Sequence, residues 1–480
     1  MTTPSIQQQA FYDWIQNGSG SCILEAVAGS GKTTSLIEAL SLMQGSIFFG
    51  AYNKKIADEI KARAPKRERL FISTMHAAGF KAWKAVAPRC EVDDRKCLKL
   101  LTAMGANPST QDAVLKLVSL AKQAAFGVVE GNNWFALIDH FDVDCGETPP
   151  GTVVREAQEL LKQSIAADSR VIDFDDMIYA PLVHKCRVFE HDWVLIDEAQ
   201  DTNASRRALA LRLLKRGGRL VAVGDRHQAI YGFTGADADS LGAIGAAVNA
   251  QEMPLTVSFR CPQEVVKYAQ NWVHHIQAAP SAPAGVVRAG DAMKEATIGD
   301  AILCRFNAPL ITAAYAFIAA GKPAKVEGRE IGNGLKALAR KWRVRSLVEL
   351  EARLETYCER ETAKLRAKEK ESAAVAVEDK VQCLLFLIQR QQNVGGDLVG
   401  LIAEIDALFA DEGDTSNRII LSSIHKSKGR EWARVFWLQT GPSPWARKEW
   451  EVEQENNLCY VAATRAKAEL VLVDIQKKGQ

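Results

Sequence analysis

The stretch Ala26-Val27-Ala28-Gly29-Ser30-Gly31-Lys32-Thr33 has the residue pattern of a loop that binds phosphate groups. The apolar run Cys22 to Glu25 before it reads as a short buried strand, and Thr33 to Met43 after it has apolar side chains at helical spacing. Backbone N–H groups at such a helix start can bind phosphate oxygens, Lys32 can reach the β- and γ-phosphates, and the Thr33 hydroxyl can hold Mg²⁺. The stretch therefore predicts a site for a nucleoside triphosphate with Mg²⁺, although Ala26 stands where the general pattern has Gly. The expected nucleotide contacts are Ala28, Gly29, Ser30, Gly31, Lys32, Thr33 and Thr34.

An acidic run follows the apolar residues Trp193 to Ile196 and is the second chemical signal. A strand that ends in two adjacent carboxylates can offer one of them to Mg²⁺ and use the other to polarise an attacking water. Asp197 is therefore the expected metal partner, together with Thr33, and Glu198 is the expected general base. The alternative is an acidic cap on the helix that follows.

Gln7 lies shortly before the first expected strand, in the run Gln7-Gln8-Gln9. Its amide offers both a donor and an acceptor, which is what an adenine edge requires. A solvated helix start is the simpler reading of the run, and Gln7 is retained as a candidate adenine contact.

Several expected strands end at polar or aromatic residues, and the carboxyl ends of parallel strands form the ligand edge of a sheet. Residues 46–52 and 70–74 have strand character, and so do 219–225, after which Gln228 could sense a γ-phosphate. Flat aromatic faces beside such an edge suit the stacking of single-stranded bases. Taken singly, each of these residues is more often an ordinary loop or core residue. The candidates for a nucleic-acid surface are Tyr52, Asn53, Thr74, His76, Tyr231 and Phe233.

The composition limits the classes of protein to which the chain can belong. With 480 residues, of which 47% are hydrophobic and 25% charged, it reads as a soluble globular chain of several domains. Ten cysteines without a Cys-x-x-Cys pair favour reduced thiols in the cytoplasm and give no support for zinc. No signal segment and no spanning apolar run is present, so we expect no membrane partner. Because the formal net charge is only +2, any nucleic-acid site must be a local groove.

Six motifs occur in an order that resembles superfamily 1 DNA helicases of the UvrD/Rep/PcrA type. They are AVAGSGKTT, LIDEAQD, VGDRHQAIYGFTGA, LTVSFRCP, SSIHKSKGREW and NNLCYVAATRAK, and with Gln7 they span the chain from residue 7 to residue 467. Six ordered motifs are far more specific than the phosphate-binding loop alone. The resemblance implies two RecA-like domains with ATP between them.

The resemblance also implies roles for residues of the C-terminal half. Phe259 resembles the aromatic residue that stacks on adenine, and Arg260 and Arg465 resemble two arginines directed at the γ-phosphate. Glu431 would meet the ribose hydroxyls, and His425 would couple DNA to the nucleotide site. Arg430 stands where the family usually has Leu, which leaves the packing role of that position open.

The expected fold is α/β, with two RecA-like parallel-sheet domains that each carry a mainly helical insertion. The first domain is expected at residues 1–84 and 171–252, with its insertion at 85–170. The second is expected at 253–327 and 415–480, with its insertion at 328–414.

The resemblance and the residue chemistry together lead us to expect an ATP-dependent DNA helicase. It would translocate 3′→5′ on single-stranded DNA and unwind duplex at single-strand/double-strand junctions, as a monomer or with weak self-association, in the bacterial or phage-like cytoplasm near the nucleoid. The polarity rests on the resemblance, and the pathway, whether repair, replication or another, is not encoded in these residues. The alternatives are a translocase that displaces bound proteins with little unwinding, and a nucleotide-gated DNA-binding module.

Overall fold

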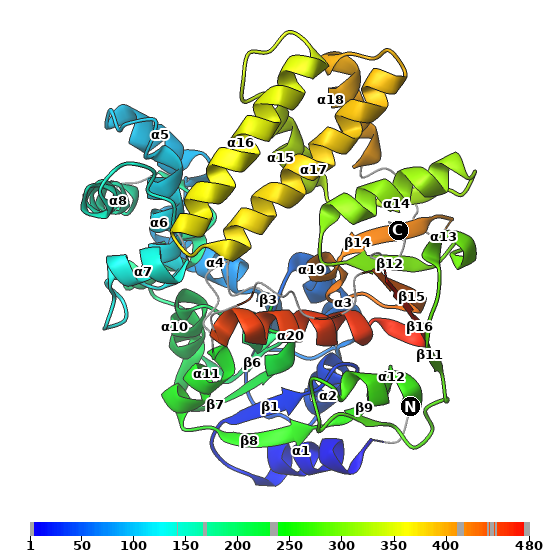
Figure 1. Ribbon diagram of the computed structural model, residues 1–480. Helices are drawn as coiled ribbons and strands as arrows, with labels where there is room; N and C mark the ends of the chain where they lie inside the picture. Colours follow the sequence, from blue (N-terminus) through cyan, green and yellow to red (C-terminus); the bar gives the residue numbers. More distant parts are fainter. Residues whose placement is uncertain are drawn as a thin grey trace. The chain divides into compact units, whose positions relative to one another are not determined.

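The computed structural model describes residues 4–141, 143–166, 170–230, 239–409, 417–438, 441, 446 and 449–474. The chain divides into two compact units, Met1–Thr256 and Val257–Gln480. Each unit is built around a six-stranded sheet in which every described strand pair is parallel (Figure 1). The expected α/β fold, with two RecA-like sheets and helical insertions, is confirmed.

The first sheet has the strand order β3-β2-β6-β7-β1-β8. Its central strands are nearly continuous apolar runs, as expected for a parallel sheet that is covered on both faces. One face packs on α1, α2 and α3, and the other on α4, α9, α10 and α11. The strands are β1 (Cys22–Ala26), β2 (Ile47–Ala51), β3 (Leu70–Thr74), β6 (His191–Ile196), β7 (Leu214–Gly224) and β8 (Gln251–Leu255); the helices are α1 (Ile6–Asn17), α2 (Lys32–Ala39), α3 (Lys54–Arg63), α4 (Met75–Val86), α9 (Asp176–Val183), α10 (Ala204–Leu213) and α11 (Ser240–Val248).

A helical insertion with its own apolar core lies between α4 and α9. The pair of short strands β4 and β5 closes its base. Its elements are β4 (Glu91–Val92), α5 (Lys96–Ala103), α6 (Gln111–Gln123), α7 (Trp134–His140), α8 (Pro150–Ser164) and β5 (Val171–Ile172).

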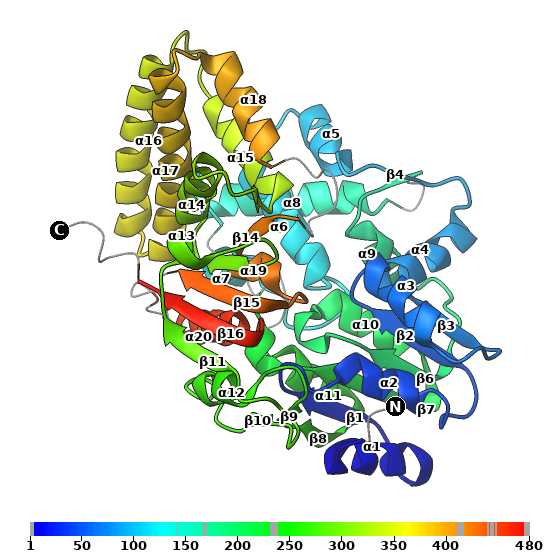
Figure 2. The ribbon, with the colours of Figure 1, turned by 90° about the vertical axis from the view of Figure 1, so that its right-hand side faces the viewer.

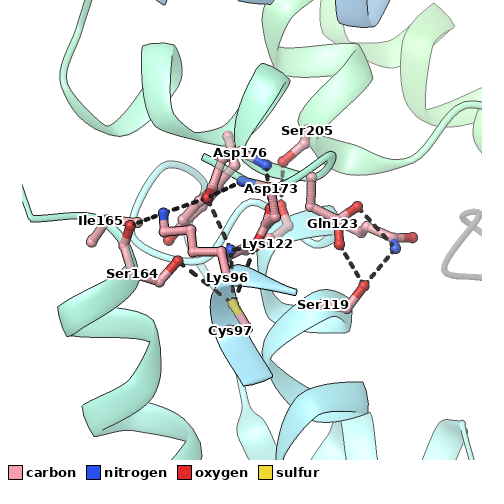
Figure 3. Close-up of polar contacts among 12 residues, drawn as sticks. Lys96, Cys97, Ser119, Lys122, Gln123, Ser164, Ile165, Asp173, Asp176 and Ser205 are labelled. Atoms are coloured by element: carbon pink, nitrogen blue, oxygen red, sulfur yellow. Dashed lines mark hydrogen bonds and ion pairs between the residues drawn. The ribbon is translucent and has the colours of Figure 1, made fainter. Parts of the chain in front are cut away.

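A buried polar cluster joins this insertion to the helices that pack on the first sheet (Figure 3). The Nζ atom of Lys122 lies 2.5 Å from a carboxylate oxygen of Asp173 and 2.8 Å from one of Asp176, and Lys96 Nζ lies 2.6 Å from the other oxygen of Asp176. Although burial acts to lower it, the two aspartates raise the pKa of Lys122 above its usual value, so this lysine stays charged. The Ser205 hydroxyl at the start of α10 donates to the Lys122 carbonyl. The cluster therefore links α5 and α6 to the segments that hold α9 and α10.

Replacing Lys122 with Met should destabilise the chain by roughly 3–5 kcal/mol, because it leaves the buried Asp173 carboxylate without its cation. Lys122 is only 1% exposed, so water cannot compensate for the lost charge. Urea unfolding measures the change. The matched control is Lys162→Met on α8, whose exposed side chain should tolerate the change within about 0.5 kcal/mol. Equal effects of the two substitutions would contradict the role assigned to the cluster.

The second sheet has the strand order β11-β16-β15-β12-β14-β13. Its flanking helices include α14 and the four-residue α19, and α20 leads into β16 (Figure 2). The strands are β11 (Val286–Ala289), β12 (Ala301–Cys304), β13 (Ala324–Val326), β14 (Ile419–Ser423), β15 (Trp432–Leu438) and β16 (Ala466–Val473), with β9 (Val257–Ser258) and β10 (Gln277–Ala278) as a separate pair; the helices are α12 (Gln263–Ala269), α13 (Ala292–Glu295), α14 (Asn307–Ala319), α19 (Ile424–Ser427) and α20 (Glu449–Ala463).

In the described residues, the insertion of the second unit has four helices between β13 and β14. The long helices α16 and α17 lie side by side, as both ribbon views show (Figures 1 and 2). Buried leucines such as Leu350 and Leu384 share one apolar core with Ile302 and Leu421 of the sheet, so this insertion packs directly on its own sheet. The helices are α15 (Arg329–Ala339), α16 (Leu347–Ala367), α17 (Glu371–Asn393) and α18 (Leu398–Leu408). No helix in the described part of the chain is both long and apolar enough to cross a bilayer.

Candidate nucleotide site and nucleic-acid surface

The loop between β1 and α2 has the backbone of a phosphate cradle. Gly29 and Gly31 have φ angles of +74° and +80°, a region that only Gly enters without strain. Gly31 is the N-cap of α2, so the unpaired N–H groups of its first turn face the loop. The Ser30 hydroxyl is buried and has no hydrogen-bond partner among the described residues. These donors fit a bound phosphate group.

The two expected metal partners are in direct contact. The Thr33 hydroxyl, at the start of α2, donates to Asp197 Oδ2 at 2.8 Å, across 164 positions of sequence. Asp197 is 3% exposed, and its burial, followed by the nearby Glu198 carboxylate, raises its pKa to about 6. Within the described ranges no group of three or more His, Cys, Asp or Glu side chains could hold a metal ion by itself. Mg²⁺ commonly takes one or two protein ligands and completes its shell with phosphate oxygens and water, so Thr33 and Asp197 fit this ion.

Glu198 lies beside the phosphate-binding lysine. Its Oε2 atom is 3.5 Å from Lys32 Nζ and accepts a hydrogen bond of 2.5 Å from Gln200 Nε2. The backbone of Glu198 has φ +52°, which is uncommon for a residue with a side chain. Such conformations cluster at functional sites, where the surrounding structure holds them.

Gln200 connects the carboxylates to Gln228. Its Oε1 atom accepts from the Asp225 backbone N–H at 3.1 Å, and Asp225 in turn accepts from Gln228 Nε2 at 2.5 Å. Gln228 is 5% exposed, so the chain of hydrogen bonds is shielded from water. Gln200 was not among the predicted site residues, although its place in the LIDEAQD motif was a signal for it.

Gln7 forms hydrogen bonds with Thr256, the last residue of the first unit. Its amide donates to Thr256 Oγ1 at 2.9 Å and accepts from the Thr256 backbone N–H at 2.7 Å. An adenine would therefore compete with Thr256 for both groups. The neighbouring Gln8 closes a capping box with Ser5 and donates to Ser35 Oγ of α2 at 2.9 Å. Gln8 thus supports the phosphate loop, and the Ser-x-x-Gln spacing was the signal for it.

Four of the predicted nucleic-acid residues, Tyr52, Asn53, Thr74 and His76, lie at the carboxyl ends of β2 and β3. Asn53 and Thr74 also have structural roles, because their side chains cap α3 and α4. Tyr52 is 38% exposed, with the Arg206 guanidinium 5.9 Å from its ring centre. Tyr231 and Phe233 lie outside the described residues.

His76 stacks on Phe174, with ring centres 4.1 Å apart and planes inclined by 26°. Burial, and then the charge of Arg206, lowers the pKa of His76 to about 3, so its ring is neutral at physiological pH. Phe174 is 54% exposed. A cavity of about 210 Å³ lies here, lined in part by His76, Phe174 and Arg206. Sequence reasoning missed Phe174 and Arg206, because their elements reach this place only through the fold.

In the second unit, Arg260 and Glu431 form an ion pair with an Nε–Oε2 distance of 2.5 Å, and Lys467 Nζ lies 3.3 Å from the other Glu431 oxygen. Burial acts to raise the pKa of Glu431, but Arg260 and Lys467 outweigh it and lower the value. Phe259 beside this group is 46% exposed, as an aromatic residue that receives a flat ligand requires. The structure therefore brings the predicted residues Phe259, Arg260 and Glu431 together.

Arg465 is held more tightly than its predicted role suggests. Arg465 is 1% exposed, and its guanidinium donates to the carbonyls of Val461 and Arg430 at 2.9 and 3.2 Å. Burial, and then the charges of Arg305 and Lys428, lowers the pKa of His425 to about 3. The side chain of Arg430, which stands where the family usually has Leu, pairs with Glu327.

Comparison with known proteins gives two family matches. Residues 7–245 match the UvrD/REP helicase N-terminal domain, and residues 339–477 match the UvrD-like helicase C-terminal domain. F-box DNA helicase protein 1 of Schizosaccharomyces pombe is 26% identical over 509 aligned residues, which cover 94% of this chain and 55% of that protein. The ATP-dependent DNA helicase Rep of Buchnera aphidicola is 26% identical, over 46% of this chain and 37% of the relative, and the ATP-dependent DNA helicase PcrA of Staphylococcus epidermidis is 23% identical, over 54% and 39%. The chain thus spans between about a third and about half of the length of these relatives.

Proposed function

Because this chain belongs to the UvrD/REP helicase family, we propose that it is an ATP-dependent DNA helicase that moves 3′→5′ along single-stranded DNA and separates duplex strands. The observation that carries the proposal is the pairing of Thr33 with Asp197 and of Lys32 with Glu198 in one partly buried site. Two of the named relatives, Rep and PcrA, are ATP-dependent DNA helicases, which supports both the nucleotide and the DNA in this proposal.

In the nucleotide site, Lys32 and the N–H groups of α2 would bind the phosphates, and Thr33 and Asp197 would hold Mg²⁺. When bound, the ion neutralises negative charge on the phosphates. Glu198 orients the attacking water and accepts its proton, and the hydrogen bond from Gln200 fixes the carboxylate for this task. Gln228, joined to Gln200 through Asp225, is the proposed sensor of the γ-phosphate.

Arg260 and Arg465 are the proposed arginines that respond to the γ-phosphate. Arg260 already binds an anion, the Glu431 carboxylate, so a terminal phosphate would compete for a guanidinium that is oriented to form charge-assisted hydrogen bonds. Loss of the phosphate after hydrolysis would return Arg260 to Glu431. In this proposal the exchange drives one step of translocation, while Phe259 and Glu431 bind the adenine and ribose.

The proposed DNA surface of the first unit combines stacking faces with one cation. Tyr52, His76 and Phe174 offer aromatic rings, and the charge of Arg206 acts on both Tyr52 and His76. A neutral ring stacks on bases without adding charge, whereas Arg206 can meet the phosphate backbone. Asn53, Thr74, Tyr231, Phe233 and His425 remain proposed contacts.

Strand displacement on tailed duplexes tests this function. We expect ATP-dependent opening of a duplex with a 3′ single-stranded tail and no opening of blunt or 5′-tailed duplexes. Opening of the 5′-tailed substrate alone would contradict the polarity. Displacement of streptavidin from biotinylated single strands without duplex opening would favour the protein-displacing translocase, and DNA binding without any ATP hydrolysis would favour the binding module.

A further inference from the structure

A groove of about 900 Å³ lies along the outer edge of the first sheet, away from the predicted nucleotide residues. The edge strand β3 forms its floor, with the end of α3 on one side and α4 on the other, and residues 187–191 before β6 complete the wall. In Figure 2, β3 lies at the margin of the sheet beside α3 and α4. The proposed function uses only the carboxyl end of β3, so the groove is a separate surface.

The outer edge of β3 has hydrogen-bonding groups to offer. The Ile47 N–H donates to the Arg69 carbonyl at 2.9 Å, which directs the odd-numbered residues of β3 toward β2. Because backbone groups alternate along a strand, the N–H and C=O of Leu70 and Ile72 point away from the sheet. Among the described strands, only β2 pairs with β3. An extended chain could therefore add to this edge as a seventh strand.

Aromatic side chains form an apolar wall beside that edge. Phe71 and Phe189 are 38% and 62% exposed, with their ring centres 5.5 Å apart, and His191 packs against both. Exposed aromatic clusters of this kind are typical anchors for large apolar side chains of a partner.

The charge of the groove has one sign. Five of its lining residues are Lys or Arg, and none is Asp or Glu. Lys61 pairs with Asp58, and Arg67 donates to backbone carbonyls, so these two are already engaged. The other three, Lys66, Lys81 and Arg187, are exposed and pair with no carboxylate of the described residues. Their charge is available to an acidic ligand.

We propose that this groove binds an extended acidic segment of a partner protein, with aromatic or aliphatic side chains at alternate positions, which pairs with the edge of β3. The backbone donors and acceptors of β3 that no described strand pairs match those of another polypeptide, and the apolar wall matches alternate side chains on one face of such a strand. Lys66, Lys81 and Arg187 match the carboxylates on the other positions. A nucleic acid would satisfy the cations but not the backbone edge.

The test uses the full chain and a fluorescein-labelled nine-residue peptide of alternating Asp/Glu and Phe/Leu residues, with binding followed by fluorescence anisotropy. We expect saturable binding that weakens about tenfold or more in Lys81→Glu/Arg187→Glu and in Phe189→Ala. The control Lys162→Glu reverses an exposed lysine on α8 and should bind as the parent chain does. Each altered side chain is exposed, so melting temperatures and DNA-stimulated ATP hydrolysis should remain unchanged, which separates this test from that of the proposed function.

Two peptides that are N-methylated at alternate positions, in opposite registers, probe the backbone pairing without altering the protein. One of the two should lose binding and the other should keep it, because only one set of N–H groups faces β3. Equal binding of both methylated peptides, or equal binding to Phe189→Ala and the parent chain, would overturn the proposal. So would an oligothymidylate that binds the groove and is lost in the charge-reversal variant while the peptide fails to bind.

Discussion

Replacing Glu198 with Gln is expected to lower DNA-stimulated ATP hydrolysis by at least ~10³-fold while ATP remains bound. The amide keeps the size of the side chain but cannot accept the proton of the attacking water. Lys32, 3.5 Å from Glu198 in the parent chain, stays in place to bind phosphate. Phosphate release measures turnover, and a fluorescent ATP analogue measures binding.

The matched control for this substitution is Glu59→Gln, an exposed residue of α3 in the same unit. This substitution removes an equal charge from the first unit at a position away from the predicted site. The variant should therefore hydrolyse ATP at the parent rate. If Glu198→Gln also did so, Glu198 would not be the general base, and the alternative reading of the acidic run as a helix cap would gain support.

Replacing Lys32 with Ala is expected to reduce turnover by a similar factor, at least ~10³-fold, and to weaken ATP binding as well. Lys32 is the only Lys or Arg in the sequence of the phosphate loop. Its side chain is 10% exposed, so water screens its interaction with phosphate only weakly. The fold should persist, because the partner Glu198 is 24% exposed and can be hydrated when the lysine is gone.

The two substitutions differ in what they leave behind, which makes them informative as a pair. Glu198→Gln should bind ATP and DNA without turnover, whereas Lys32→Ala should bind DNA with little response to ATP. Lys55→Ala, an exposed lysine of α3, is the control for the second. Normal hydrolysis by Lys32→Ala would refute the assignment of the loop to phosphate binding.

The sequence determined the parts of this protein that depend on local chemistry. The two glycines of the phosphate loop were predictable because only Gly adopts the positive φ angles found at Gly29 and Gly31 without strain. The strand before the loop was predictable because parallel strands that are covered on both faces are apolar throughout. The six ordered motifs identified the family and suggested roles for individual residues, which no single residue could have done.

The sequence predicted that Thr33 and Asp197 would share a metal ion, and they come into contact because β1 and β6 are parallel strands of one sheet and end at the same edge. Tertiary structure alone decided other meetings of distant groups. Phe174 reaches His76 because the chain returns from the helical insertion to α9, which packs against α4. Likewise, the edge of β3 that no described strand pairs, beside exposed aromatic and cationic side chains, exists only in the folded chain. The type of a residue determines which interactions its side chain can make. Packing between segments far apart in sequence determines which neighbours it meets, and so which of these interactions form.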